Sequence, residues 1–500
     1  MSQYLSQTRI EEPTWFEADD ILFLRNRISE AETQLESLDG QIDQRDAKLV
    51  DIAACQNVLS PIGRVPLEIL GEIFCLSCSP DYIWRASHNI IHYTSILSCV
   101  CVAWRKAANA TPQLWSTLCL NAENNRTLHG QFGWLEKWVD RCQGHSLDLY
   151  LALPEGKSRN GEELFHSILR FSHKIRVLNV SGYWSSLLPL IYYSSFPLLE
   201  EVDFEVNDIP NADGTVKLPP HKIDALLGAP KLRRATMREF GELSLLTVLI
   251  LPVEQLTSLR ITSDFNPSNI YMNLLHRCKN LVNLELHYDS DFILMDNARS
   301  SLNLHICLPS LKSLSLHGNL LECFTAPHLE ELTLLYDSCN FHSFYMKVDA
   351  FQQRSRTALS TLSFENFNDH GEEDESTNFI DDLIAMLSLF PTLSKYGISD
   401  CSFNVNPLLR ALTVNQSGQV LLPKLEHLSL LMYDCKNYSL ELKALILSRW
   451  WPDDDIYGCV SEDGHGSLRL QTVALNRRYF KVFKDITPAL PGLIILDSWN

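Results

Sequence analysis

Apolar residues recur at alternating intervals of three and four in the first part of the chain, with polar residues between them. This spacing is that of a coiled-coil seam, and it predicts one helix over residues 17–57, after a polar, flexible segment of residues 1–16. Two uses of the seam stay open, because the helix can self-associate or pack back on the next domain. The seam positions, all apolar except Arg45, are Ile21, Leu24, Ile28, Ala31, Leu35, Leu38, Ile42, Arg45, Leu49 and Ile52.

A second pattern is the stretch SPIGRVPLEILGEIF, residues 60–74, which is too apolar for an ordinary surface helix. Pro66 can occupy the first turn of a helix, where its missing N–H is not needed. The apolar residues after it fall on two faces, so the helix needs two packing partners. The first face holds Leu67, Leu70 and Phe74, and the second holds Ile69, Ile73 and Leu76.

A third pattern at helical spacing predicts another helix, which ends before Pro112 because the residue preceding a proline disfavours helical geometry. We expect the second face of the first helix, with Ile69 and Ile73, to pack against this helix. The first face, with Pro66 at its mouth, would then be a docking surface for another protein. The apolar positions of the second helix are Ile96 or Leu97, Val100, Cys101, Trp104 and Ala108.

From about residue 145 the chain repeats the pattern P-x-L-x-x-φ-x-φ, in which φ is an apolar residue. Looser copies lack the proline, and most copies lie 24 to 34 residues apart, near the period of about 20–29 residues of leucine-rich repeats. No copy can bury its apolar face alone, so we expect the copies to stack as an irregular α/β leucine-rich-repeat solenoid over residues 121–500. The six full copies begin at Pro197, Pro230, Pro309, Pro327, Pro391 and Pro423.

Charge and composition narrow the class of protein. The net charge of −19 argues against general nucleic-acid binding, which needs clustered Lys and Arg, and against docking on an anionic membrane. The N-terminus predicts no signal peptide, and the longest apolar runs, such as Leu243–Val253, are too short to span a bilayer. The 14 cysteines lie mostly in apolar runs, so we expect reduced core thiols in a cytoplasmic or nuclear protein.

Motifs of catalysis are missing from the sequence. It contains no G-x-S-x-G, H-E-x-x-H, P-loop or dinucleotide fingerprint, so we expect a protein that is not an enzyme and holds no cofactor. Cys75, Cys78, His88 and His92 approach a zinc-binding pattern. However, nine residues separate Cys78 from His88, where about twelve are usual. We therefore expect no metal site there.

The segment from about Ser60 to Leu120 resembles an F-box domain, because it carries VPLEIL and IF, then VCVAWR, then TPQLW, in that order. The layout of heptad helix, F-box at residues 58–120 and irregular repeats is similar to that of large fungal F-box families. The resemblance implies a small all-helical unit that docks on a Skp-family adaptor and, through it, on a cullin. The implied adaptor-binding residues are Pro66, Leu67, Ile69, Leu70, Ile73, Phe74, Val100, Cys101 and Trp104.

Residues that alternate with the buried positions of each repeat strand should face solvent. In the copy after Leu199 these residues are acidic, and in the next two copies several are basic. One hypothesis is that Arg234, Arg238 and Arg260 bind an acidic or phosphorylated segment of a substrate. The alternative is that acidic and basic strands neutralise each other on a solvated face.

The resemblance implies a substrate-recruiting subunit of a Skp–cullin–F-box ubiquitin ligase, in which the repeats bind an unknown protein substrate. A second hypothesis is a repeat scaffold that binds a partner without delivering it for ubiquitination. The two differ in whether a cullin accompanies the adaptor.

Overall fold

The structure is a computed structural model in which the chain forms two compact units. These are Met1–Glu205 with Gly228–Lys231, and Val206–Leu227 with Leu232–Asn500. The residues that it describes are 17–37, 42–59, 61–79, 89–121, 133–153, 159–192, 195–207, 221–240, 244–263, 269–288, 305–335, 341–366, 376–401, 403–414, 420–432, 438–450, 468–483, 490 and 492–497.

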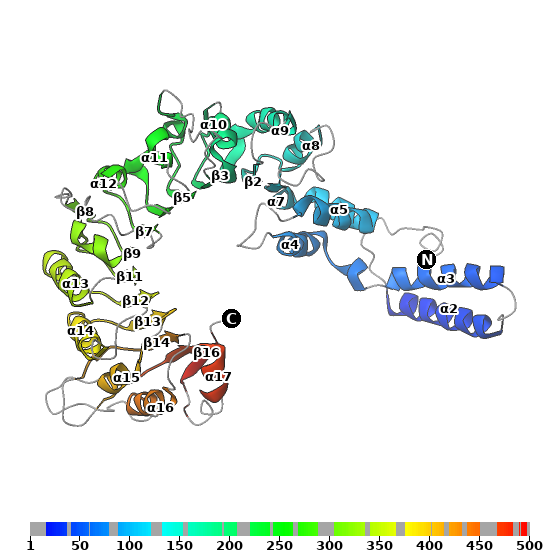
Figure 1. Ribbon diagram of the computed structural model, residues 1–500. Helices are drawn as coiled ribbons and strands as arrows, with labels where there is room; N and C mark the ends of the chain where they lie inside the picture. The colour runs from blue at the N-terminus through cyan, green and yellow to red at the C-terminus, as the bar shows by residue number, and fades with distance from the viewer. Residues whose placement is uncertain are drawn as a thin grey trace. The chain divides into compact units, whose positions relative to one another are not determined.

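The first unit begins with two helices, α2 (Ala18–Ser37) and α3 (Ile42–Leu59), which lie side by side (Figure 1). The prediction of one continuous helix over residues 17–57 is therefore wrong. The two helices bury Leu24, Ile52 and Cys55, so part of the heptad seam is covered within one chain. Self-association of this helix pair stays a prediction.

Short helices follow, and each boundary has a local cause. Pro66 precedes α4 with extended backbone, and the side chain of Asn89 accepts the N–H of His92 (3.1 Å) at the start of α5. Cys101 is extended and separates α5 from α6, so the predicted second helix is two helices. The elements are η1 (Pro61–Arg64), α4 (Leu67–Cys78), α5 (Ile90–Val100), α6 (Val102–Ala110) and α7 (Pro112–Trp115).

Three strands of a sheet and most of a fourth belong to the first unit. Strands β1, β2 and β3 pair in parallel, and β4 follows β3 in the strand order. Helical segments connect successive strands, as parallel pairing requires. The strands are β1 (Thr117–Asn121), β2 (Leu147–Ala152), β3 (Ile175–Tyr183) and β4 (Glu201–Asn207), and the helices are α8 (Gly133–Arg141), α9 (Arg159–Leu169), η3 (Ser172–Lys174) and α10 (Trp184–Tyr192).

The second unit is an α/β repeat. In its described part, ten strands follow one another in chain order in a sheet, and each strand from β5 to β16 pairs in parallel with the next. The strands are β5 (Arg234–Phe240), β6 (Ser258–Ser263), β7 (Asn283–Tyr288), β9 (Ser313–His317), β11 (Glu331–Leu335), β12 (Thr361–Glu365), β13 (Lys395–Ser399), β14 (His427–Leu431), β15 (Thr472–Leu475) and β16 (Ile494–Asp497).

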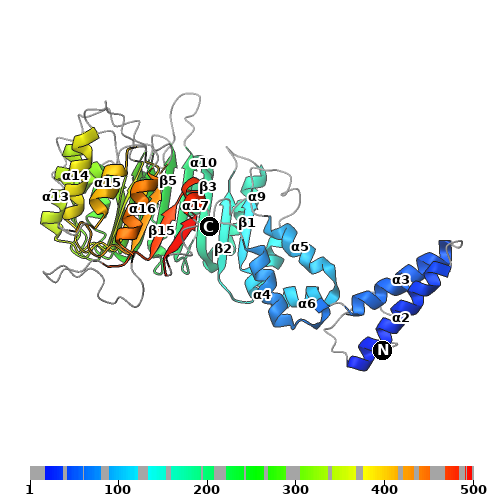
Figure 2. The same ribbon diagram turned by 90° about the horizontal axis from the view of Figure 1, so that it is seen from below.

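The helices of this unit line one face of its sheet, and the opposite face is left open (Figures 1 and 2). The short strands β8 (Ile306–Cys307) and β10 (Phe324–Thr325) form a separate parallel pair. The helical segments are η4 (Ala225–Gly228), α11 (Leu245–Val248), η5 (Val253–Gln255), α12 (Asn269–Leu275), η8 (Gly318–Cys323), α13 (Phe341–Ser355), α14 (Ser376–Ser388), α15 (Asn406–Leu412), α16 (Ser439–Ser448) and α17 (Arg477–Phe483).

The repeat pattern read from the sequence accounts for the core. In each full copy, the leucine two residues after the proline is buried in the turn before the strand. The two apolar residues of the rest of the pattern are buried in the strand itself. In β11, for example, Leu332 and Leu334 have no exposed surface. The prediction of an α/β repeat is confirmed at this level. The buried leucines of the six full copies are Leu199, Leu232, Leu311, Leu329, Leu393 and Leu425.

No helix in the described ranges combines the length and the apolar character needed to cross a bilayer.

Candidate functional site on helices α4 and α5

The inward face of α4 holds the larger side chains of the first predicted face. Leu70 and Phe74 are buried, and the Phe74 ring packs at 5.0 Å from the ring of Trp104 on α6. Gly71 is also buried, against Thr111, where a larger side chain would collide with the threonine. The face that we expected to remain free for a partner is therefore the one that holds the helices together.

The outward face of α4 is apolar as well. Ile69 and Ile73 are each 45 % exposed and Leu76 is 80 % exposed. At intervals of four and three residues they line up along one side of the helix. The expected orientation of α4 is thus reversed, because Ile69 and Ile73 do not face the core. We call these three residues the α4 stripe.

Helix α5 carries a matching set, of which the sequence analysis named only Val100 as a contact residue. Tyr93, Ile96 and Val100 are 45 %, 49 % and 54 % exposed. Their spacing of three and four residues places them along one side of α5, and we call them the α5 stripe. The spacing itself was a detectable signal, but Ile96 and Val100 also fitted a core-facing pattern.

Exposed apolar side chains concentrate in this part of the chain. Among the described residues, the large hydrophobic side chains that are strongly exposed number 20, and seven of them lie between Ile62 and Val100. Scattered exposed leucines need no explanation, whereas a concentration of this kind is typical of an interaction surface.

The remaining predicted residues frame the two stripes. Pro66 is exposed and Leu67 is half-buried at the start of α4. Cys101 is half-buried, and its Sγ accepts the N–H of Trp104 (3.4 Å) at the start of α6. Trp104 is half-buried over Phe74. Of the predicted contact residues, only Leu70 and Phe74 are removed from solvent entirely.

Hydrogen bonds from side chains to backbone carbonyls join the helices of this unit. The indole N–H of Trp115 donates to the carbonyl of Ala108 (2.7 Å), which joins α7 to α6. The Arg105 guanidinium donates to the carbonyl of Ser98 (3.0 Å) and so joins α6 to α5. Together with the contact of Phe74 on Trp104 between α4 and α6, these bonds join the helices that carry the two stripes.

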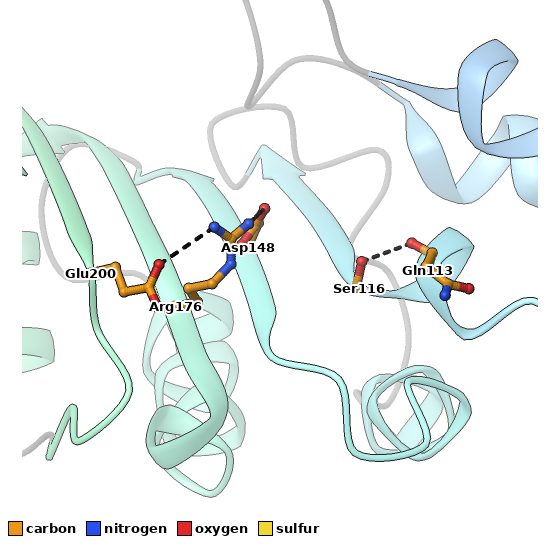
Figure 3. A network of polar contacts seen from close by, with 5 residues as sticks. All are labelled: Gln113, Ser116, Asp148, Arg176 and Glu200. Atoms are coloured by element: carbon orange, nitrogen blue, oxygen red, sulfur yellow. Dashed lines mark hydrogen bonds and ion pairs between the residues drawn. The ribbon is translucent and has the colours of Figure 1, made fainter. Parts of the chain in front are cut away.

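A polar network joins α7 to the strands of the first unit (Figure 3). The carbonyl of Ser116 accepts the N–H of Asp148 (2.8 Å), and the Ser116 hydroxyl donates to the carbonyl of Gln113 (2.7 Å). The Arg176 guanidinium lies between Asp148 (2.6 Å) and Glu200 (3.8 Å). Burial raises the pKa of Asp148, and the adjacent Arg176 opposes that increase. The network is structural, because its carboxylates are occupied by Arg176.

The three arginines of the substrate hypothesis come together on the open face of β5 and β6. Arg260 lies in register with Thr236, between the levels of Arg234 and Arg238. The Arg260 guanidinium is paired with Glu285 (2.5 Å) on β7. That arginine is therefore neutralised by its neighbour in the structure.

The cysteines and histidines of the zinc-like spacing lie on different helices. Cys75 and Cys78 belong to α4 and His92 to α5, while His88 lies outside the described residues. Within the described ranges no three metal-binding side chains cluster together. Burial raises the pKa of Cys78, as expected for a core thiol.

Comparison with known proteins gave no match, either to a protein-family model or to a curated protein sequence.

Proposed function

We propose that this protein is a substrate-recruiting subunit of a Skp–cullin–F-box ubiquitin ligase, with α4 to α7 as the F-box. The observation that carries the proposal is the pair of exposed stripes on α4 and α5, in the segment that resembles an F-box. A Skp-family adaptor would cover them, because burying apolar surface is the main driving force of such association.

The acidic side chains beside the α4 stripe suit the rim of a protein–protein interface. Glu68 and Glu72 are exposed on α4 beside Ile69 and Ile73. Stable interfaces commonly have an apolar centre and a polar rim. The stripe would supply the centre and the two carboxylates would lie at the rim, where they affect association rate more than affinity.

The repeats of the second unit would bind the substrate. Among the described elements, their sheet has helices on one face only (Figure 1), and repeat proteins use such extended open surfaces for binding. Arg234, Arg238 and Arg260 remain a proposed contact for an acidic segment, although Arg260 would first have to leave Glu285.

The proposal is tested by the double variant Ile69→Glu and Ile73→Glu in the full chain. Both side chains are about half exposed, so folding should persist. Two carboxylates against an apolar partner surface should weaken adaptor capture by about 100-fold or more. Co-purification with a Skp-family adaptor and a cullin measures the effect.

A matched control is Leu447→Glu on α16, because Leu447 is 50 % exposed on a helix of the second unit. It should retain adaptor and cullin. Unchanged capture by the double variant would refute the proposed docking surface. Capture of the adaptor without a cullin by the wild-type chain would favour the scaffold hypothesis instead.

A further inference from the structure

The open face of the second unit's sheet has a distinct central part on strands β9 to β14. The helices of this unit lie on the other face (Figures 1 and 2). At the first two open-face positions of each strand the side chains are half-buried or exposed, whereas their neighbours are buried in the core. At the carboxyl ends of β9 and β11 the open-face residues His317 and Leu335 are buried as well. Among the described residues, no helix covers these first two positions on any of the five adjacent strands.

The middle of this face is formed by small residues in register. Thr333 pairs with its neighbours on both sides, and the same level continues through the next strands. No side chain at this level is larger than threonine, so another backbone can approach the sheet closely. The five residues, which we call the central row, are Ser315, Thr333, Ser363, Gly397 and Ser429.

The dimensions of the central row suit an extended chain. Neighbouring strands are about 4.8 Å apart, so five strands span about 19 Å. An extended polypeptide rises about 3.3 Å per residue, and the row therefore accommodates about six residues. Its hydroxyl groups both donate and accept hydrogen bonds, which is what a peptide backbone requires.

Glu365 lies on the open face at the carboxyl end of β12, two residues beyond the row, and the charge of Asp400, which follows the end of β13, acts on it. Glu365 is in register with Ser399, and Asp400 is the next residue. The backbone N–H of Asp400 donates to the carbonyl of Leu431 (3.0 Å), which fixes the Asp400 backbone beside the end of β14. Among the described residues, no salt bridge is formed by Glu365 or Asp400.

Cations on nearby strands are directed elsewhere. The guanidinium of Arg260 is paired with Glu285 (2.5 Å), and Lys312 is paired with Glu330 (2.8 Å). Lys395 lies at the other end of β13, about 16 Å from Asp400 along the strand. The carboxyl-end side of this face is thus negative and lacks a nearby cation in the described part of the chain.

The electrostatics of Glu365 agree with this geometry. Burial raises the pKa of Glu365, and the charges of Asp400 and Glu285 raise it further. A half-buried carboxylate beside like charges is stabilised by an incoming cation. Charge complementarity therefore favours a basic occupant.

We propose that this face binds an extended segment of the recruited protein that carries a lysine or arginine. Its backbone lies over the central row, and its cationic side chain lies between Glu365 and Asp400. The identity of the occupant as a recruited protein rests on the proposed function, whereas the recognised chemistry rests on the sheet face alone. An apolar or acidic segment is not matched by these carboxylates.

The test is a selection of random octapeptides on the immobilised full chain. The wild-type protein should enrich Lys or Arg at least tenfold at one peptide position. The double variant Glu365→Gln and Asp400→Asn should abolish this enrichment, since it removes both charges. Asparagine is chosen at residue 400 because it tolerates the left-handed backbone there (φ 54°). The variant Glu365→Lys should instead enrich Asp or Glu.

The matched control is Glu331→Gln, which removes one carboxylate at the opposite end of the same face and should leave the enrichment intact. A second test is Ser363→Trp, which fills the central row and should abolish selection while circular dichroism shows the chain folded. No enrichment by the wild-type chain, or enrichment unchanged by the double variant, would overturn the proposal.

Adaptor capture in the same variants separates the two proposals. If Glu365→Gln with Asp400→Asn leaves capture intact and peptide enrichment is not seen in the wild type, only the peptide site is refuted. If enrichment is found and adaptor capture fails, the ligase function is refuted and the peptide site stands.

Discussion

Single buried charged residues determine the local packing of the repeat unit. Glu239 on β5 is 2 % exposed, and its carboxylate accepts the N–H of Leu245 (2.7 Å) and the hydroxyls of Ser244 (3.2 Å) and Tyr271. These bonds tie β5 to the start of α11 and to α12. A buried carboxylate is retained only where such donors replace water.

The Glu239 carboxyl leads to a pH prediction. Burial raises its pKa in the folded chain above the usual value of 4.5. Between the usual pKa and the raised pKa, the folded state therefore binds more protons than the unfolded state. Its contribution to stability is therefore full at low pH and decreases as pH rises through the raised pKa. Glu239→Gln cannot titrate, so its stability relative to wild type should increase from pH 4.5 to pH 7.

Urea unfolding midpoints of wild type and Glu239→Gln at the two pH values measure this difference. The matched control is Glu254→Gln, since the Glu254 side chain is 84 % exposed, and its stability relative to wild type should hold constant. A difference between wild type and Glu239→Gln that is independent of pH would contradict the assignment.

Residue-level detail of this kind could not be predicted from the sequence. Arg449 has no exposed surface, and its guanidinium donates to the carbonyls of Leu412 (2.8 Å), Leu422 (2.9 Å) and Leu421 (2.5 Å). Burial lowers its pKa to about 10. Neither this arginine nor Glu239 belongs to a repeat motif, because their partners are backbone groups and hydroxyls that only the fold brings together.

At the scale of elements, the two apolar faces of α4 were predictable from the helical period, but their orientation was not. The face of α4 that points to the core is the one that packs on an aromatic ring. Phe74 packs on Trp104 (5.0 Å between ring centroids), while Ile73 stays half exposed. Only Val100 of the α5 stripe was predicted as a contact residue, for a related reason. Cys101 breaks the helix after Val100, so the apolar positions before and after it belong to different helices.

This orientation predicts unequal losses of stability for neighbouring residues of α4. Phe74→Ala should destabilise the α4–α7 unit by about 3–5 kcal/mol, because it removes a fully buried ring and leaves a cavity. Ile73→Ala should cost less than about 1 kcal/mol, since the side chain is already half in water. Hydrogen exchange of the α4 amides measures both effects, and a larger loss for Ile73→Ala would show the helix to be turned the other way.

At the scale of the whole molecule, the repeat was the best-predicted feature. The octets beginning at Pro309 and Pro327 gave β9 and β11, with the expected residues buried. The period-two pattern lies within each strand. It recurs along the sequence because every stacked repeat buries the same positions of its strand. The heptad run was less informative, since its 3-4 spacing is satisfied equally by one long helix or by the pair α2 and α3.

The same limit applies to the interaction surfaces. Sequence alone identified the helical segment that carries the proposed docking surface but not which side of α4 is exposed. It also could not show that Arg260 is neutralised by Glu285 or that Glu365 and Asp400 lie at adjacent strand ends. Each of these depends on register between segments distant in the chain.

The central claim is that the stripes of α4 and α5 bind a Skp-family adaptor. The most direct measurement is hydrogen exchange of the full chain with and without a purified Skp-family adaptor. The account predicts slower exchange in Leu67–Cys78 and Ile90–Val100 when the adaptor is present, because covering both stripes suppresses local opening of these helices. Absence of binding, or protection confined to other segments, would contradict the account.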